Sequence, residues 1–349
     1  MSTVAEPNRR IAIWLFVIAL AIYAMVIVGG ATRLTGSGLS ITVWDPIIGA
    51  LPPFSQQAWQ QAFDLYQQSP QYKITNAGMS LDEFKGIFYW EYFHRLLGRA
   101  IGVIFFFPFL YFLFTKQISR KFVPHLVAIF LLGGLQGALG WFMVKSGLVD
   151  KPWVSPYRLT AHLLTALFLY AYVLWQAFRL WGVGDTNQDK VACNLKGWSL
   201  VLLGLLVVQI SYGGFVAGLH AAMTYPTFPT MNGQWIPEGL LRQVPLWSNF
   251  FENHTTTQFI HRGLAFLLVI SVALYWRRSA GVKRLVFGRN LLLAAVLLQF
   301  LLGVLTIVNS AGHVPVTLGV LHQAGAVALL SVLLYLIYLS GPRTAAAEA

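Results

Sequence analysis

The chain has 349 residues, of which 57% are hydrophobic, 15% aromatic and only 10% charged, and its mean hydropathy is +0.63. Soluble domains carry roughly 25% charged residues, so this composition excludes an ordinary soluble protein and indicates an integral membrane protein. The formal net charge is +12, which could also suit a nucleic-acid partner. The positions of the basic residues decide between these two readings.

Eight apolar stretches are long enough to cross a bilayer, because a membrane-spanning helix needs roughly 20 apolar residues. They lie at 11–32, 91–115, 123–144, 159–178, 197–219, 257–276, 290–308 and 316–340. We therefore predict an all-α polytopic membrane protein with eight transmembrane helices. The first stretch is too long for the apolar part of a cleavable signal peptide, so we expect it to be retained as an anchor.

Most of the basic residues fall on one side of the membrane if the eight stretches alternate in direction. Fourteen of the 24 do so: Arg9, Arg10, Lys116, Arg120, Lys121, Arg179, Lys190, Lys196, Arg277, Arg278, Lys283, Arg284, Arg289 and Arg343. Cytoplasmic loops are enriched in Lys and Arg, so this pattern predicts cytoplasmic N and C termini. Because no Arg/Ser-rich transit sequence precedes the first stretch, we expect the membrane to be a bacterial inner membrane. The positive charge then reflects membrane topology, and no nucleic-acid partner is expected. The single cysteine, Cys193, excludes an intrachain disulfide.

Matching features recur in the same order on the two sides of a polar segment at 182–196. Paired glycines, Gly29-Gly30 and Gly213-Gly214, fall late in the first and fifth stretches. We predict a parallel repeat of two pseudo-symmetric four-helix bundles, at 1–181 and 197–349, because an even number of spans gives both halves the same orientation. The long outer loops, at roughly 34–87 and 220–255, could cover sites on the outer face. In the first loop, an amphipathic run at 55–68 precedes a capping box that begins at Ser80.

Four histidines occupy matching places near the start of the even-numbered stretches: His94, His162, His261 and His322. Between 16 and 22 residues separate each of them from the next cytoplasmic basic residue, which corresponds to about 24–33 Å of helix. That length is nearly the full hydrocarbon thickness, so all four should lie near the outer boundary. A single intramembrane histidine is often a helix–helix hydrogen bonder. Two matched pairs instead indicate two iron porphyrins, each held between facing imidazoles.

One residue distinguishes the two pairs. Glu91 lies three positions before His94, whereas Gln258 lies three before His261. A carboxylate touching a span is costly and usually functional, and this one could orient the imidazole or accept a proton. Alternatively, Glu91 could simply pair with Arg95 at the interface. We hypothesise that the half with Glu91 holds the porphyrin on which chemistry occurs, and that the other half holds a permanent low-spin haem for electron transfer.

Five arginines near the outer boundary could bind porphyrin propionates or could extend to the headgroups as ordinary interfacial residues. Arg95 and Arg262, each directly after a predicted ligand, are the first candidates, and the others are Arg33, Arg99 and Arg158. The remaining membrane-boundary histidines are not expected to bind iron, although His220 and His254 could line an entrance. The other two are His125 and His313.

Three other functions share parts of this pattern. A carboxylate-bridged di-iron site fails because it needs a second Glu-x-x-His, and the second copy begins with Gln258. A dihaem cytochrome b type electron-transfer subunit remains open, although its haems are often stacked across the membrane rather than placed at one depth. A transporter would show glycine or proline breaks in the middle of paired spans, and Pro108 is the only mid-span proline.

Several segments resemble the haem A synthases of cytochrome oxidase assembly. They are 29–40 (GGATRLTGSGLS) with Trp44 and Pro46, 91–99 (EYFHRLLGR), 159–167 (LTAHLLTAL), 259–262 (FIHR) and 321–330 (LHQAGAVALL). They are spread over essentially the whole chain, and the first two are specific. Some branches of that family carry a cysteine pair in the first outer loop. This chain has no cysteine in that loop, so it resembles the cysteine-free branch, which lacks the pair.

The resemblance implies eight helices in two bundles and oxidation of a ring methyl of haem O to the formyl group of haem A. Carried over by position, His261 and His322 would bind a haem b cofactor, and His94 and His162 would bind the substrate haem. Glu91 would be the essential glutamate. The implied partners are haem O, haem O synthase, oxidase assembly factors and an unidentified electron acceptor. A homo-oligomer is also possible.

Overall fold

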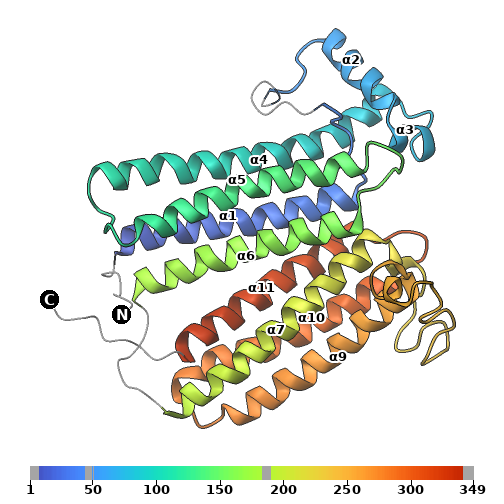
Figure 1. Cartoon of the computed structure of the whole chain (residues 1–349). Coiled ribbons are helices and arrows are strands. Elements are labelled where there is room, and N and C mark those ends of the chain that lie inside the picture. The colour runs from blue at the N-terminus through green and yellow to red at the C-terminus, as the bar shows by residue number, and fades with distance from the viewer. Residues whose placement is uncertain (1–7, 44–48, 50, 183–189, 341–349) are drawn as a thin grey trace.

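The computed structural model describes residues 8–43, 49, 51–182 and 190–340. Within these ranges the chain is helical, with one isolated β-bridge between Met231 and Gln234 and no strand (Figure 1). The α-helices are α1 (Arg9–Leu34), α2 (Gln56–Gln67), α3 (Pro70–Ile74), α4 (Leu81–Phe114), α5 (Val123–Ser146), α6 (Pro156–Trp181), α7 (Lys190–Gly218), α8 (Asn249–Glu252), α9 (His254–Arg278), α10 (Val286–Val308) and α11 (Val316–Ser340).

Eight of these helices are long and apolar enough to span a membrane, which confirms the predicted fold class. They are α1, α4, α5, α6, α7, α9, α10 and α11, with α10 preceded by a short 3₁₀ turn. α4 begins ten residues before the predicted span, because the capping box at Ser80 and Glu83 forms as expected. The added turns also bring acidic residues into the helix, and one of them, Asp82, has a side chain that is 90% exposed.

The equivalent helices make equivalent contacts in the two halves. In the first half α1 packs on α4 and α6, and α5 packs on the same two helices. In the second half α7 packs on α9 and α11, and α10 likewise contacts both. The halves meet where α1 contacts α11 and where α6 contacts α7 and α11 (Figure 1). The contacts are of the same kind in both groups of four helices, and the pseudo-symmetric repeat itself stays a prediction.

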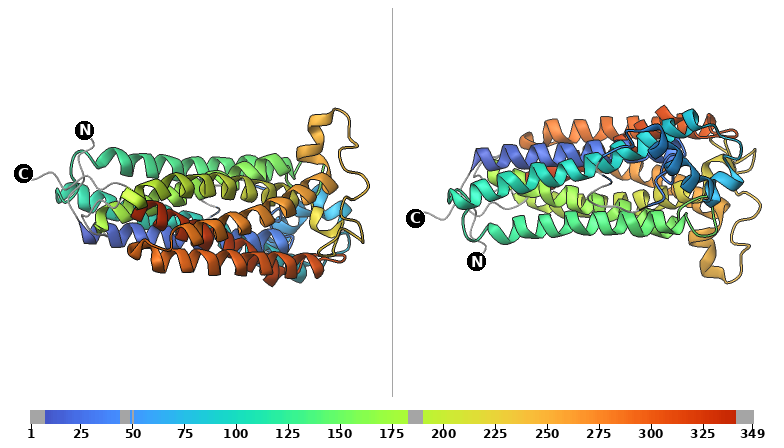
Figure 2. Two further views of the ribbon diagram at one scale, coloured as in Figure 1. Left: turned by 90° about the horizontal axis from the view of Figure 1, so that it is seen from below. Right: turned by 90° about the horizontal axis from the view of Figure 1, so that it is seen from above.

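The long helices run side by side, with the large loops gathered at one end (Figure 2). At the opposite end the start of α1 contacts the ends of α4 and α6. The backbone nitrogen of Asn8 donates to the Leu180 carbonyl over 3.1 Å, and its side chain donates to the Gln117 carbonyl over 3.2 Å. The ends that the charge pattern assigns to the cytoplasm therefore lie together.

Two apolar clusters hold the fold. The larger one runs through all eight spans and both halves. The smaller one lies beneath the first outer loop, where Trp59, Phe63 and Tyr66 of α2 are buried against Phe84 and Phe88 of α4. The spacing of the α2 residues places them on one helix face, so the amphipathic run predicted at 55–68 anchors the loop to the outer turns of α4.

One expectation changes at a segment boundary. The polar segment expected at 182–196 is helical from Lys190 onward, so Cys193 lies in α7 rather than in a loop. Trp44, Pro46 and Arg343 lie outside the described residues.

Candidate functional site

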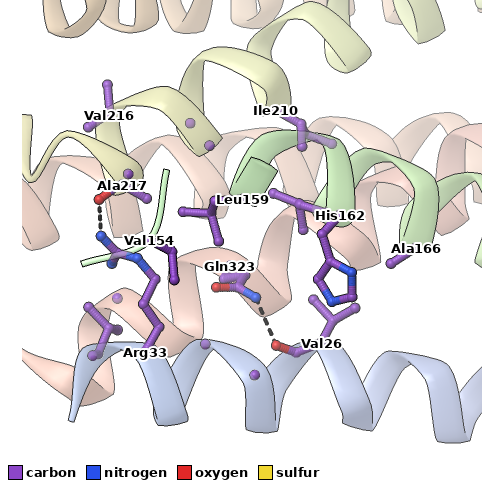
Figure 3. A pocket seen from close by; sticks show the side chains of 18 of the residues that line it. Val26, Arg33, Val154, Leu159, His162, Ala166, Ile210, Val216, Ala217 and Gln323 are labelled. Atoms are coloured by element: carbon purple, nitrogen blue, oxygen red, sulfur yellow. Dashed lines mark hydrogen bonds between the residues drawn. The ribbon is translucent and has the colours of Figure 1, made fainter. Parts of the chain in front are cut away.

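A cavity of about 2150 Å³ opens between the helices of both halves. All four predicted histidines line it, together with Glu91 and Gln258. Pockets for one small molecule or cofactor usually measure about 300–1,000 Å³, so this cavity is large enough for more than one bulky group. Figure 3 shows part of its wall, where His162 of α6 faces α1 across the space.

Each of the four imidazoles lies against a glycine on a neighbouring helix. A Cβ added at any of these glycines would lie 2.9–3.3 Å from the ring, so a larger residue would displace the histidine. The pairs are His94 with Gly29, His162 with Gly140, His261 with Gly213 and His322 with Gly303. The glycines noticed in the sequence at 29 and 213 therefore make room for the predicted ligands, and two further glycines do the same.

The second histidine pair has the spacing that an iron between two rings requires. The ring centroids of His261 and His322 are 6.4 Å apart, and the ring planes are at 87°. An imidazole nitrogen lies about 2 Å from a metal that it binds, so two rings on opposite faces of one metal have centroids roughly 6 Å apart. The Nδ1 atom of His261 is buried, and it has no hydrogen-bond partner among the residues that the structure describes. These residues fit a haem held between α9 and α11.

Three of the four histidines also have a glutamine beside a ring nitrogen. The amide nitrogen of Gln299 lies 3.1 Å from Nδ1 of His322, and that of Gln209 lies 3.5 Å from Nε2 of His261. In the amide orientation that satisfies its neighbours, Gln136 donates to Nδ1 of His162 over 3.2 Å. These glutamines limit how far each ring can turn. They were not among the residues predicted from the sequence.

Glu91 is buried, and its carboxylate accepts four hydrogen bonds from neighbouring residues. Oε2 accepts from the Ser40 hydroxyl and from the Ile41 backbone nitrogen, both over 2.8 Å. Oε1 accepts from Nη2 and Nε of Arg95 over 2.6 and 3.1 Å. Arg95 also donates to the Ile41 carbonyl over 2.9 Å. The pairing with Arg95 that the sequence left as an alternative does occur, on the cavity wall, and it fixes the first outer loop there.

The second half holds its own loop from the same two positions. Gln258 donates to the Tyr225 carbonyl over 3.1 Å, and Arg262 donates to the carbonyls of Tyr225 and Thr227 over 2.7 and 2.8 Å. In both halves, therefore, the side chains three positions before and one position after a histidine (His94 or His261) bind the loop that follows the preceding long helix. A guanidinium has five N–H donors, so these hydrogen bonds do not exclude a contact with a porphyrin propionate. That contact of Arg95 and Arg262 stays a prediction.

The remaining candidates lie around the cavity or next to it. Arg33 donates to the carbonyl of Ala217, and Gln323 donates to the carbonyl of Val26 over 2.8 Å, so both side chains join the two halves (Figure 3). Arg158 donates to the Phe142 carbonyl over 2.7 Å. The structure also places these further residues in the cavity wall: Arg99, His220, His254 and His313.

His125 does not join this group, because its Nδ1 lies 2.7 Å from the Tyr172 hydroxyl near the other end of the helices. His220 does line the cavity. Its burial, together with the nearby charges of Arg33 and His254, lowers its pKa to about 4. His220 is therefore a neutral member of the cavity wall, in line with the expectation that it could line an entrance.

Comparison with known proteins agrees with the sequence motifs. The family model described as cytochrome oxidase assembly protein matches residues 12–334. The chain belongs to this family. It is 49% identical over 332 residues to a protein named heme A synthase from Nitrosospira multiformis, covering 94% of this chain and 92% of the relative. A heme A synthase from Nitrosomonas eutropha is 47% identical over 335 residues, covering 95% of this chain and 93% of the relative. The family resemblance drawn from the sequence is therefore confirmed.

The glutamines were missed although the sequence carries a signal for them. Each stands four residues before the glycine that faces its histidine, as Gln136 stands before Gly140 and Gln299 before Gly303. A search for Gln-x-x-x-Gly in the span before each histidine would have found them. The signal becomes meaningful once the helices in contact are known.

Proposed function

We propose that this protein is a haem A synthase, which oxidises a ring methyl of haem O to a formyl group and so supplies haem A to a terminal cytochrome oxidase. The observation that carries the proposal is one large cavity lined by two histidine pairs, of which one has a glutamate and the other a glutamine at the same place. The near full-length similarity to proteins named heme A synthase supports the same conclusion.

We assign the second pair, His261 and His322, to a resident haem b. Their ring spacing fits one iron, and each ring is next to a glutamine amide. When bound there, haem b would supply reversible one-electron chemistry. The protein's part is to hold both imidazoles in place and to surround the group with apolar helix faces.

We assign the first pair, His94 and His162, to the iron of haem O. Glu91 is on the helix face of His94 and lines the same cavity, so it is the acidic side chain best placed to take a proton from the reacting methyl carbon. Conversion of the methyl through the alcohol to the aldehyde, written with water as the source of the oxygen, releases four protons and four electrons, and the electrons would pass to the unidentified electron acceptor. Four hydrogen bonds from protein donors hold the carboxylate of Glu91 in a fixed orientation on the cavity wall.

The positions of the two histidine pairs along their helices suggest on which side of the membrane the reaction occurs. The histidines lie six or seven residues after the start of α6, α9 and α11, at the end of the bundle where the large loops gather. With cytoplasmic termini in a bacterial inner membrane, both haems would lie towards the periplasm. Haem O synthase and oxidase assembly factors are the partners that this reaction implies.

Identification of the bound haems tests the proposal. The protein is purified from cells that make haem O, its haems are extracted with acid solvent, and they are separated and identified by mass. We expect haem B together with haem O or haem A. Haem B alone, in cells that contain haem O, would contradict the assignment and favour a dihaem cytochrome b.

A further inference from the structure

The helix that faces each histidine repeats one pattern. A glycine lies against the imidazole, and four positions earlier on the same helix stands a residue whose side chain reaches either the ring or the next turn of the histidine helix. In three of the four cases this earlier residue is a glutamine: Gln136, Gln209 and Gln299. In α1, where Gly29 faces His94, the residue is Met25.

The contacts of Gln136 show what the glutamine does. Its amide donates to both Nδ1 and the backbone carbonyl of His162, over 3.2 and 3.3 Å, and accepts from the Ala166 nitrogen over 3.0 Å. Gln299 repeats two of these contacts with Nδ1 and the carbonyl of His322, over 3.1 and 2.8 Å. A carboxamide offers both a donor and an acceptor, so it can hold a ring nitrogen in either tautomer.

Met25 reaches the corresponding place but cannot make these contacts. A Cβ added at Gly98 would lie 3.3 Å from Cε of Met25, and Gly98 is four residues after His94, as Ala166 is four after His162. A thioether is a weak acceptor and has no donor, and a methionine side chain changes rotamer easily. His94 therefore has an apolar, adaptable neighbour where the other three histidines have an amide.

We propose that Met25 makes His94 the exchangeable iron ligand of the four, so that the first site releases its porphyrin and the second site retains it. The proposal rests on the assignment of the first pair to substrate and the second to cofactor. A substrate site must open after each reaction, whereas a cofactor site must stay closed. Partners that orient a ligating histidine typically change metal affinity by about 10–100-fold, which is enough to separate the two behaviours.

Haem transfer to an excess of apomyoglobin measures this release without any turnover. The purified protein is loaded with haem B until both sites are filled, and the change in the visible spectrum is followed over time. Variants lacking both ligands of one site, H94A/H162A and H261A/H322A, assign each kinetic phase to a site. We expect a fast phase from the first site and a slow phase from the second.

The informative variants exchange the two side chains. M25Q should slow the fast phase by about 10-fold or more and raise the low-spin share of the spectrum, since the amide then holds His94. M25L, which keeps the position apolar, should release haem as the unaltered protein does. Q209M should speed the slow phase by about 10-fold or more.

An unchanged fast phase in M25Q would overturn the proposal, and so would equal slowing in M25Q and M25L. Loss of the slow phase in M25Q would show that this variant does not fold. In that case Q209M alone tests the proposal, and an unchanged slow phase in Q209M would overturn it. These outcomes are independent of product formation. If the unaltered protein forms haem A but M25Q releases haem at an unchanged rate, the role of Met25 is rejected and the proposed function stands.

Discussion

In both parts of the cavity, two side chains next to a histidine bind the backbone of a loop, but the types of these side chains differ. In the first half Glu91 and Arg95 hold the loop at Ile41 through an ion pair that is neutral overall. In the second half Gln258 and Arg262 hold the loop at Tyr225 through neutral carbonyls, so their net charge is positive. Glutamate and glutamine have nearly the same shape. The comparison therefore shows two similarly built sites that differ by one carboxylate, which is the proposed proton acceptor.

The largest expected effect comes from removing that acceptor. Glu91→Gln should lower haem A formation by about 100-fold or more while both haems remain bound, because general acid–base groups contribute about 10²–10⁴-fold. Product and haem content are measured in the same purified samples. Ser40→Ala is the matched control, since it removes one donor to Glu91 and keeps the charge. Retained product formation in Glu91→Gln with normal haem content would remove Glu91 from the reaction.

The two arginines should differ in their effect on stability. Arg95→Ala leaves the carboxylate of Glu91, which is 3% exposed, without its ion pair, and breaking such a buried pair costs about 3–5 kcal/mol. Arg262→Ala removes hydrogen bonds to backbone carbonyls and leaves no buried charge, which costs about 1.5–3 kcal/mol. Thermal unfolding in detergent, followed by tryptophan fluorescence, compares the two variants. A larger loss for Arg262→Ala would show that the ion pair does not hold the first loop.

Substitution of the glycines that face the histidines should have a smaller effect on haem binding, and its size should depend on the space at each glycine. A Cβ would lie 2.9 Å from His322 at position 303 but 3.3 Å from His261 at position 213. Gly303→Ala should therefore weaken haem binding at the second site, by roughly 10-fold on the scale of changes that disturb a ligand's orientation. Gly213→Ala, which needs less movement, should have a weaker effect. Haem content after gel filtration measures both variants, and the reverse order would contradict this packing.

The smallest effect concerns the pH dependence of stability. His220 has a pKa of about 4 in the folded protein and about 6.5 as a free side chain, so the unfolded state binds the proton more readily. Stability should fall as the pH drops from 7.5 through 6.5 towards 4, with His220 contributing about 1 kcal/mol because solvent screening reduces the full effect. His220→Asn keeps a residue that tolerates the positive φ of 56° and should flatten this pH dependence. Equal pH profiles for the two proteins would contradict the prediction.

Sequence alone was sufficient for the features that are local along the chain. Hydropathy gave the eight spans, and the residue types at Ser80 and Glu83 gave the true start of α4. The recurrence of histidines at one helix depth brought all four into one cavity. Each of these depends on spacing within a single helix.

The remaining features depend on which distant segments meet. The carboxylate of Glu91 is bound by Ser40 and Ile41, some 50 residues away, through a loop whose path no periodicity predicts. In the same way, the relation of Met25 to His94 depends on α1 packing against α4. The sequence therefore located the candidate ligands, and the contacts between helices revealed which neighbouring side chains differ between the two histidine pairs.

The central claim is that the two histidine pairs hold different haems, and haem analysis of ligand-pair variants tests it most directly. H94A/H162A and H261A/H322A are purified from cells that make haem O, and their extracted haems are identified by mass. We predict that the first variant keeps haem B and lacks haem O and haem A, and that the second loses haem B. The same mixture of haems lost from both variants would contradict the division into a substrate site and a cofactor site.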